Sequence, residues 1–132
     1  MFSSKISLVH NMLLVVASLA AFGLAQASGT GEATVFEPEL GVCGHINNAQ
    51  DFVVRVSADV FDTFPGATAN PKDNPICNKQ LDATSEGKSV TVTITDRCEG
   101  CPPTGIDLSP VAFNELSEPS VGKLSGVAWT IF

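Results

Sequence analysis

The sequence predicts a small, mainly β, disulfide-bonded protein with about six short strands and two short helices, arranged as a barrel or a sandwich. Eight prolines and eleven glycines divide the chain into short pieces. Between these breaks, β-branched and apolar residues alternate with polar ones. Short strands separated by regular turn signals are typical of barrels and sandwiches.

The first half of the chain opens with an expected strand at residues 32–36, where β-forming residues alternate. A loop at 38–48 follows, and a valine-rich strand is expected at 51–56. Ser57 can then cap a short helix at 58–64, because its hydroxyl can accept a hydrogen bond from the first helical turn.

The clearest expected element is a hairpin, in which strand 77–84 pairs with strand 88–95 across a Ser-Glu-Gly turn. Apolar residues at 90, 92 and 94 alternate with threonines. This period of two indicates a strand with one buried face.

The last part of the chain contains a tight loop at 97–105 and a short strand at 106–108. A Ser-Pro pair at 109–110 provides a cap and a proline at the first helical position, which opens a helix at 111–116. A final strand is expected at 124–132.

Segment 54–62 can be aligned with segment 106–114 at an offset of 52 residues. Both contain a strand end, a serine cap, a short helix and a phenylalanine followed by Asp or Asn, although only the serine and the phenylalanine are identical. This offset is about half the length of residues 28–132, which suggests two intertwined halves related by a pseudo-twofold axis.

The N-terminus predicts a signal peptide covering residues 1–27. Lys5 precedes an almost wholly apolar run at 12–24, and Ala-Gln-Ala at 25–27 is a small-x-small cleavage site. The apolar run is short for a membrane span, which needs about 20 residues. A retained anchor is the alternative. We therefore expect a secreted, single-domain protein of residues 28–132, monomeric and without a membrane segment after cleavage.

Loss of Lys5 would leave 6 basic and 14 acidic residues, a net charge of −8. Such a surface repels phosphate backbones, which argues against nucleic-acid binding. The charge favours a neutral or cationic partner, or it serves only solubility.

All four cysteines lie in the part expected to be secreted: Cys43, Cys77, Cys98 and Cys101. An even number in an oxidising compartment predicts two disulfides, and the spacing leaves three connectivities open.

The Cys-Glu-Gly-Cys segment at 98–101 has a redox and a metal alternative. A redox motif needs its first cysteine at a helix N-terminus, but two prolines follow and no helix is expected there. Zinc needs a second ligand pair, and His45 is the sole histidine after residue 27. His45 also lacks the partners of a Ser-His-Asp triad, so we expect no metal, no cofactor and no such catalysis.

Five motifs together resemble the double-psi β-barrel proteins of the rare-lipoprotein-A, expansin and barwin type. In chain order they are Gly-Glu-Ala-Thr-Val-Phe at 31–36, Gly-Val-Cys-Gly at 41–44, Cys-Asn-Lys at 77–79, the strand 92–95 with Asp-Arg-Cys at 96–98, and Gly-Ile-Asp-Leu-Ser-Pro-Val-Ala-Phe at 105–113. They cover nearly all of residues 28–132. The resemblance implies a six-stranded double-psi β-barrel with two short helices and the pairings Cys43–Cys77 and Cys98–Cys101.

The resemblance also implies a polysaccharide groove lined by Thr34, Asp96 and Asp107. In related glycan-cleaving proteins the position of Asp107 serves as a general acid, so Asp107 is the candidate catalytic or groove-binding residue. Two carboxyls, one of them protonated, suit glycoside cleavage. The alternative is that Asp96 and Asp107 are structural acceptors for loop amides.

The sequence departs from the expansin pattern where sugar-stacking residues are expected. It has no tyrosine, and Trp129, its single tryptophan, falls in the last strand, where we expect it to face the core. Cys98 replaces an aromatic residue of the family. Phe36 and Phe64 can substitute only if they are exposed, because stacking needs an accessible ring face.

These features favour a protein that binds cell-wall polysaccharide of the glucan, chitin or peptidoglycan type without efficient hydrolysis. One alternative is a protein-binding module, such as a cysteine-protease inhibitor or a secreted effector, with segment 61–76 as its contact loop. A weak lytic transglycosylase or endoglucanase is the other. An exposed aromatic row would favour sugar, and an exposed apolar loop would favour protein.

Overall fold

The structure, a computed structural model, describes residues 24–132. Residues 1–23, which make up most of the expected signal peptide, lie outside the described residues. Within the described part, none of the helices has the length and apolarity needed to cross a membrane.

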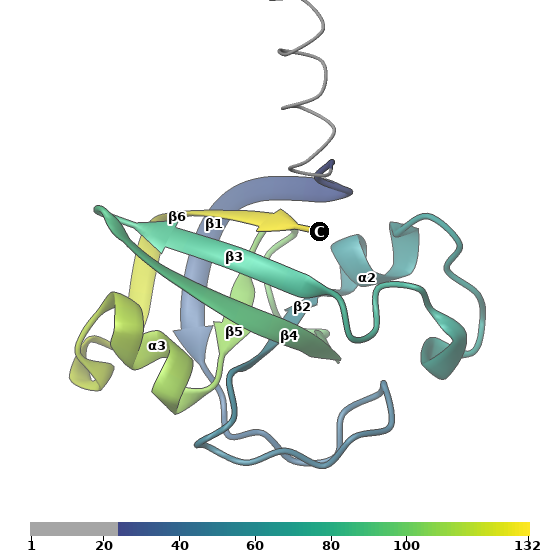
Figure 1. Cartoon of the computed structure of the whole chain (residues 1–132), viewed down its shortest axis with the longest axis horizontal. Coiled ribbons are helices and arrows are strands. Elements are labelled where there is room, and N and C mark those ends of the chain that lie inside the picture. Colours follow the sequence, from purple (N-terminus) through teal and green to yellow (C-terminus); the bar gives the residue numbers. More distant parts are fainter. Residues whose placement is uncertain (1–23) are drawn as a thin grey trace, which may run out of the picture.

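Six strands close into a single barrel, with the neighbour order β1-β5-β2-β4-β3-β6 (Figure 1). This confirms the mainly β prediction and decides between the barrel and the sandwich. The strands and helices are β1 (Ala27–Val35), β2 (Val53–Ser57), α2 (Ala58–Thr63), η1 (Pro71–Asp73), β3 (Gln80–Ser85), β4 (Lys88–Cys98), β5 (Ile106–Leu108), α3 (Pro110–Leu116), η2 (Pro119–Val121) and β6 (Lys123–Ile131).

Three strands differ in length from the sequence expectation by two residues or more, and one of them, β4, runs to Cys98 and not only to residue 95. Strand β1 starts at Ala27, five residues before the expected strand at 32–36, because its first part pairs antiparallel with β6. Strand β3 starts at Gln80 and not at residue 77, because Asn78 has a φ of 70° and interrupts the extended backbone. Asn is one of the few residues that adopt this left-handed conformation readily.

The two aligned segments of the sequence form two strand-to-helix units, β2–α2 and β5–α3. Their strands are antiparallel neighbours, and Arg55 pairs with Asp107, its own counterpart at the offset of 52. Strand β2 pairs in parallel with β4, and β5 pairs in parallel with β1. This arrangement is the pseudo-twofold relation that the sequence repeat predicted, with Arg55 and Asp107 at its centre.

The two capping serines have different roles despite their equivalent positions. The Ser57 hydroxyl accepts a hydrogen bond from the Val60 amide and donates one to the Pro103 carbonyl at 2.6 Å. The Ser109 hydroxyl makes no bond to its own helix and instead accepts from the Val53 amide at 3.3 Å. Ser109 occupies the expected N-cap position, but its side chain ties β2 to the start of α3.

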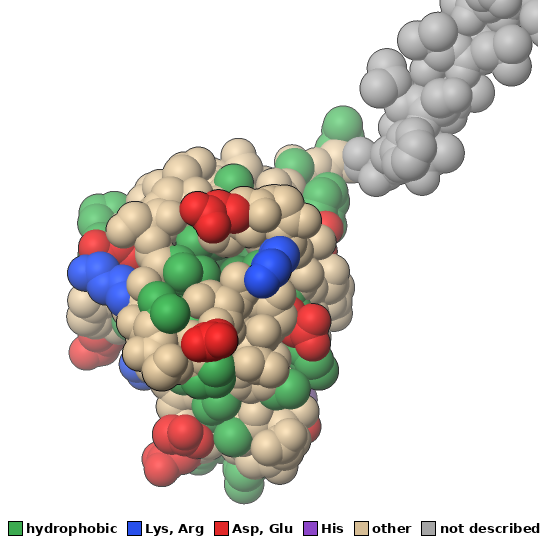
Figure 2. Space-filling model, turned by 90° about the vertical axis from the view of Figure 1, so that its left-hand side faces the viewer, with side chains coloured by type: hydrophobic (Ala, Val, Ile, Leu, Met, Phe, Trp, Pro, Cys, Tyr) green, Lys and Arg blue, Asp and Glu red, His purple; other side chains and the backbone are tan. Residues whose placement is uncertain are grey.

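The barrel interior holds the apolar core, which includes Trp129, 3% exposed and facing inward as expected. Segment 61–76 was a candidate contact loop, but its large apolar side chains, those of Phe61, Phe64 and Ile76, are buried. Three exposed large apolar side chains, Leu40, Ile46 and Phe52, lie instead in segment 36–52, which runs beneath the barrel in Figure 1. On the face drawn in Figure 2, acidic, basic and apolar side chains are interspersed.

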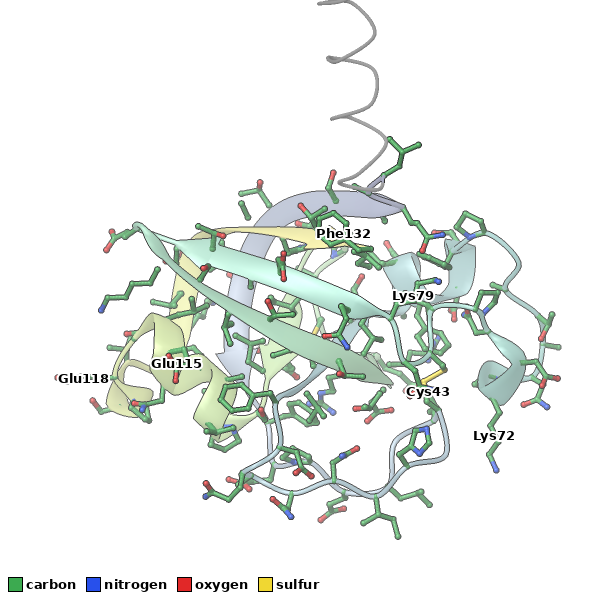
Figure 3. The ribbon with its side chains drawn as sticks, viewed as in Figure 1. Cys43, Lys72, Lys79, Glu115, Glu118 and Phe132 are labelled. Atoms are coloured by element: carbon green, nitrogen blue, oxygen red, sulfur yellow. A yellow bond between two sulfur atoms is a disulfide. The ribbon has the colours of Figure 1, made fainter. Side chains whose placement is uncertain are left out.

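Both disulfides implied by the resemblance are present. The Cys43–Cys77 bond joins segment 36–52 to the chain before β3, and Figure 3 shows it beside the end of β4. The Cys98–Cys101 bond closes a local loop after β4. None of the cysteines is free in the part of the chain that the structure describes.

Candidate functional site: a polar trough centred on Asp107

Four polar residues lie in one row across four neighbouring strands of the barrel. Thr34 of β1 is in register with Asp107 of β5, Asp107 with Arg55 of β2, and Arg55 with Asp96 of β4. The row contains the three residues that the resemblance implied, and it adds Arg55 between the two carboxylates.

Asp107 is the most buried member of this row, with a side chain 7% exposed. Arg55 donates from its Nε to Oδ2 of Asp107 at 2.6 Å, and the Thr34 hydroxyl donates to Oδ1. The sulfur of Cys98 lies 3.4 Å from Oδ2. Both carboxylate oxygens therefore accept hydrogen bonds from within the protein, and the charge is balanced by a guanidinium.

Arg55 is itself held in place from its other side. Its guanidinium carbon lies 4.8 Å from the centre of the Phe36 ring, which is a cation–π distance. The side chain is 34% exposed, so Arg55 presents part of its guanidinium to solvent beside the buried Asp107. Its remaining N–H groups can donate to a ligand hydroxyl.

Asp107 and Arg55 line an open cavity of about 560 Å³, together with Glu32, Thr34 and Arg97. A second cavity of about 540 Å³ adjoins it and is lined partly by residues of α2 and of segment 67–71. Arg97 and Glu99 line both cavities, so the two cavities meet at these two side chains. We call the two cavities together the trough.

Arg97 links the walls of the trough through three charge-assisted hydrogen bonds. It donates to both carboxylate oxygens of Asp62 in α2 at 2.9 and 2.7 Å, and to Glu99 of the disulfide loop at 2.8 Å. The hydrogen bond from Arg97 lowers the pKa of Asp62 below its ordinary value. The same bond raises the pKa of Arg97, with Glu99 adding to the effect.

Asp96 belongs to the row but not to the lining of either cavity. Its Oδ1 accepts from the Val42 amide at 3.0 Å and from the Arg97 amide at 2.8 Å. This is the structural role that the sequence left open for Asp96: the carboxylate fixes segment 36–52 against the end of β4.

Among the described residues, no aromatic side chain lines the trough except Phe61, which is 2% exposed. Phe64 is buried, and Phe36 has Arg55 against one ring face. The trough therefore offers charged and polar groups to a ligand and lacks an open aromatic platform.

The sulfurs of Cys98 and Cys101 and a carboxylate oxygen of Asp107 lie within 4.8 Å of one another. Metal binding by cysteine requires thiolates, and here the two sulfurs are joined in a disulfide. In this oxidised form the group provides one carboxylate, and that carboxylate is already bound by Arg55 and Thr34.

Arg55 is the site residue that sequence reasoning did not single out. The signal was present, because the internal repeat places Arg55 opposite Asp107 in the alignment. Residues equivalent by a twofold relation meet at the axis when their strands are antiparallel neighbours. A buried aspartate at such a position needs a cationic partner, and its repeat mate is an arginine.

Comparison with known families is consistent with this geometry. Residues 28–128 match the family model DPBB_1, described as lytic transglycolase, a double-psi β-barrel family. The chain belongs to this family.

Proteins similar to this chain carry names that describe different properties. The "Allergen Asp f 7 homolog" of Arthroderma benhamiae is 32% identical over 114 residues, which are 76% of this chain and 38% of that protein. The chain thus spans well under half of that relative. The "Papain inhibitor" of Streptomyces mobaraensis is 29% identical over 103 residues, 76% of this chain and 68% of that protein.

Two solved structures share the fold and are of at least 25% identity. The Streptomyces papain inhibitor has a TM-score of 0.72 and 27% identity, and the match covers 81% of this chain and 96% of the inhibitor. A mutant expansin of Clavibacter michiganensis in complex with cellohexaose has a TM-score of 0.62 and 25% identity, covering 80% of this chain and 50% of the expansin. A shared double-psi barrel does not by itself assign an activity.

Proposed function

We propose that this protein is secreted and binds a strand of neutral cell-wall polysaccharide in the trough without efficiently hydrolysing it. The observation that carries the proposal is the pair of adjoining open cavities, with a buried, charge-balanced Asp107 in the lining of the first. Two cavities side by side suit an extended chain, and their charged lining offers many donors and acceptors to hydroxyl groups. The related expansin structure that contains cellohexaose supports the same ligand class.

The contacts of Asp107 favour binding over cleavage. A general acid must carry a proton on an oxygen that faces the leaving group. Here Oδ1 and Oδ2 both accept hydrogen bonds from protein donors. The second expected carboxylate, Asp96, is turned to backbone amides. The site thus lacks the pair of free carboxyls that glycoside hydrolysis uses.

A variant that obstructs the trough without disturbing the fold tests this proposal. Gly100 lines the trough, and a Cβ placed on it would meet no other atom within 4 Å. We expect Gly100→Gln to weaken retention on insoluble cellulose, chitin or peptidoglycan about tenfold. Ser89→Gln adds the same side chain at an exposed position of β4 outside the trough and should leave retention unchanged.

Equal retention of wild type and Gly100→Gln on every glycan would refute binding in the trough. If the wild type releases soluble sugars with new reducing ends and Gly100→Gln does not, the trough cleaves the glycan and the proposal of binding without hydrolysis is wrong. Both results can be read from one set of pull-down and reducing-end assays.

A second candidate function is inhibition of a cysteine protease, which the similarity to Streptomyces papain inhibitor, both in sequence and in structure, supports. The specific observation is the tip of segment 36–52, where Leu40 and Ile46 form a β-bridge and are 68% and 81% exposed. Such a stapled apolar tip suits insertion into a protease cleft. Ile46→Ser should then weaken papain inhibition while Gly100→Gln leaves it intact, and absence of inhibition by the wild type would remove this candidate.

Secretion has its own test. Residues 1–27 are proposed to be removed as a signal peptide, which would give a mature chain that starts at Ser28. Ser28 is already paired with Thr130 in β1–β6, so the barrel would keep its closure. Mass spectrometry of culture supernatant should show this N-terminus, whereas an intact Met1 or a purely cell-bound protein would contradict it.

A further inference from the structure

A third cavity of about 450 Å³ shares no lining residue with the trough. It lies between segment 45–53, the middle of β4 and Asn78, where segment 36–52 passes beneath the barrel (Figure 1). We call it the loop pocket. Neither the family resemblance nor the proposed function gives it a role.

The loop pocket combines an accessible aromatic ring with a ring of neutral polar groups. Phe52 is 42% exposed and is outside the apolar core. Around it lie the amides of Asn47 and Asn78 and the hydroxyl of Thr93. The trough, in contrast, is lined by charged groups and lacks an open ring face.

Asp51 is the one carboxylate in the pocket lining, and it is partly used by the protein. Its Oδ2 accepts from the Asn47 side-chain amide at 3.1 Å and from the Asn48 backbone amide at 3.0 Å. The Asp51 carboxylate therefore has donors within the protein and does not require a cationic ligand. A neutral ligand would also bind without the cost of removing its own charge from water.

Asn47 is held in one orientation at the wall of the pocket. A flipped amide would place its oxygen against the Asp51 carboxylate. Its Oδ1 is buried and has no hydrogen-bond donor among the described residues, so this oxygen is closed to a ligand and Asn47 serves as a fixed wall.

The pocket is also held rigid on both sides. The Cys43–Cys77 disulfide ties segment 36–52 to the residue before Asn78. The backbone carbonyl of Phe52 accepts from the backbone amide of Thr93 at 3.0 Å. The backbone amide of Asn78 donates to the backbone carbonyl of Ile94 at 2.9 Å. A preformed pocket loses less conformational entropy when it binds a ligand.

We propose that the loop pocket is a second binding site, which takes one neutral pyranose ring of a glycan. A pyranose has an apolar C–H face that can pack on Phe52 and hydroxyls that can bond to the side-chain amide of Asn78. The Thr93 hydroxyl, which accepts from the Gln80 side-chain amide at 3.1 Å, can still donate to a ligand. Phe52 supplies the platform that the trough lacks. This inference extends the proposed function, since two separate sites make a single domain bivalent toward a wall surface and raise its avidity.

The test is a titration of the ¹⁵N-labelled protein with cellohexaose and, separately, with the N-acetylglucosamine hexamer. Binding is monitored through the backbone amide chemical shifts in NMR spectra. At least one glycan should move the amides of 45–53 and 93–95 saturably. Phe52→Ala should weaken this saturation about tenfold. Asn78→Gly should weaken it several-fold, because glycine removes the amide and keeps the left-handed φ of 70°.

Phe132→Ala is the matched control for loss of an exposed ring. Phe132 is 46% exposed at the end of β6, on the other side of the barrel from segment 36–52 in Figure 3. This variant should leave the shifts of 45–53 and 93–95 unchanged, and so should Gly100→Gln, which alters only the trough. The spectrum of each variant also reports whether it is folded.

The outcomes separate the two sites. Shifts in the loop pocket that persist in Gly100→Gln, and that weaken in Phe52→Ala and Asn78→Gly, support the inference whether or not the trough binds. No loop-pocket shifts with either glycan would overturn it, and so would shifts that neither variant weakens. Trough shifts alone would leave the proposed function standing and reject the second site.

Discussion

Each of the two carboxylate oxygens of Asp107 accepts a hydrogen bond from a neighbouring side chain. Arg55 and Thr34 occupy one oxygen each, and a disulfide sulfur lies beside Oδ2. Arg55 gains a second partner in the Phe36 ring. The residue that the family pattern marks as functional is therefore also part of the structural framework of the barrel.

We expect Asp107→Asn to lower both stability and glycan retention. An amide carries no charge, so the Arg55 guanidinium loses its ionic partner, whereas the Thr34 hydroxyl can turn to accept from the new NH₂ group. Weakening a hydrogen bond between charged groups in this way costs about 1–3 kcal/mol. For a domain of this size the melting temperature should fall by roughly 5–15 °C, measured by circular dichroism on the same samples used for pull-downs.

A double variant checks the cause of that loss. If the loss of the negative charge facing Arg55 is responsible, Arg55→Met combined with Asp107→Leu should be more stable than Asp107→Leu alone. In the double variant no buried charge is left unpaired. Additive losses in the double variant would show that the ion pair is not the source. An unchanged melting temperature in Asp107→Asn would contradict the assigned contacts.

Sequence reasoning reached Asp107 and Thr34 through the family resemblance, but it did not reach Arg55. Residue types predict that a buried carboxylate needs a partner, yet they do not say which cation supplies it. That choice depends on strand register, which places Arg55 opposite Asp107 and leaves Asp96 to the loop amides.

At the scale of elements, the two strand-to-helix units show how equivalent sequences can carry different contacts. The Ser57 hydroxyl bonds to the Val60 amide and to the Pro103 carbonyl. The Ser109 hydroxyl accepts from Val53, whose amide is already bonded to the Asp51 carbonyl.

We therefore expect Ser57→Ala to be more destabilising than Ser109→Ala. Loss of an N-cap hydroxyl costs about 1 kcal/mol, and the unpaired Pro103 carbonyl adds to it in Ser57→Ala. Loss of the Ser109 hydroxyl leaves the Val53 amide with its backbone partner. Urea unfolding of both variants measures the difference, and equal or reversed losses would contradict the assigned roles.

Helix α2 is joined to the disulfide loop by the Arg97–Asp62 ion pair, which predicts a pH effect. The pKa of Asp62 is lowered in the folded protein by the hydrogen bond from Arg97. The stabilisation is therefore complete above the ordinary aspartate pKa of about 3.9 and is lost as the pH falls through the lower folded value.

We expect Asp62→Asn to reduce the loss of melting temperature between neutral pH and about pH 2, relative to wild type. The effect should be small, because both side chains are partly exposed and the pair is screened by salt. Asp59→Asn is the control, since its exposed carboxylate lies on the same helix and has no salt bridge among the described residues. An identical pH profile for wild type and Asp62→Asn would contradict a stabilising pair.

At the scale of the whole molecule, the local patterns predicted the strands and helices, and the five family motifs predicted their closure into a barrel. Alternation can show that a strand is half buried, but it does not show which neighbour it pairs with. The order β1-β5-β2-β4-β3-β6 depends on crossovers between distant segments. Exposure was the other limit. Segment 61–76 was a candidate contact loop, but composition could not show whether its side chains are exposed, and Phe61, Phe64 and Ile76 are buried.

We expect the two disulfides to differ in their contribution to the free energy of unfolding. Cys43–Cys77 closes a loop of sequence separation 34, whereas Cys98–Cys101 has a separation of 3. By loop-closure entropy the long bridge should contribute about 4 kcal/mol and the short one about 2 kcal/mol. Replacing both cysteines of the long bridge by alanine should therefore lower the melting temperature more than the same change at the short bridge.

Glycan binding in the trough should be weakened more by loss of the Cys98–Cys101 bridge than by loss of the Cys43–Cys77 bridge. Cys98 and Cys101 line the trough, and Cys98 contacts Asp107, whereas Cys43 and Cys77 line neither of its cavities. Opening the short bridge should therefore reduce trough binding in a protein that is still folded. Measuring melting and trough shifts on both double variants gives the full comparison. If the short-bridge variant kept wild-type trough binding, the disulfide loop would not be part of the binding surface.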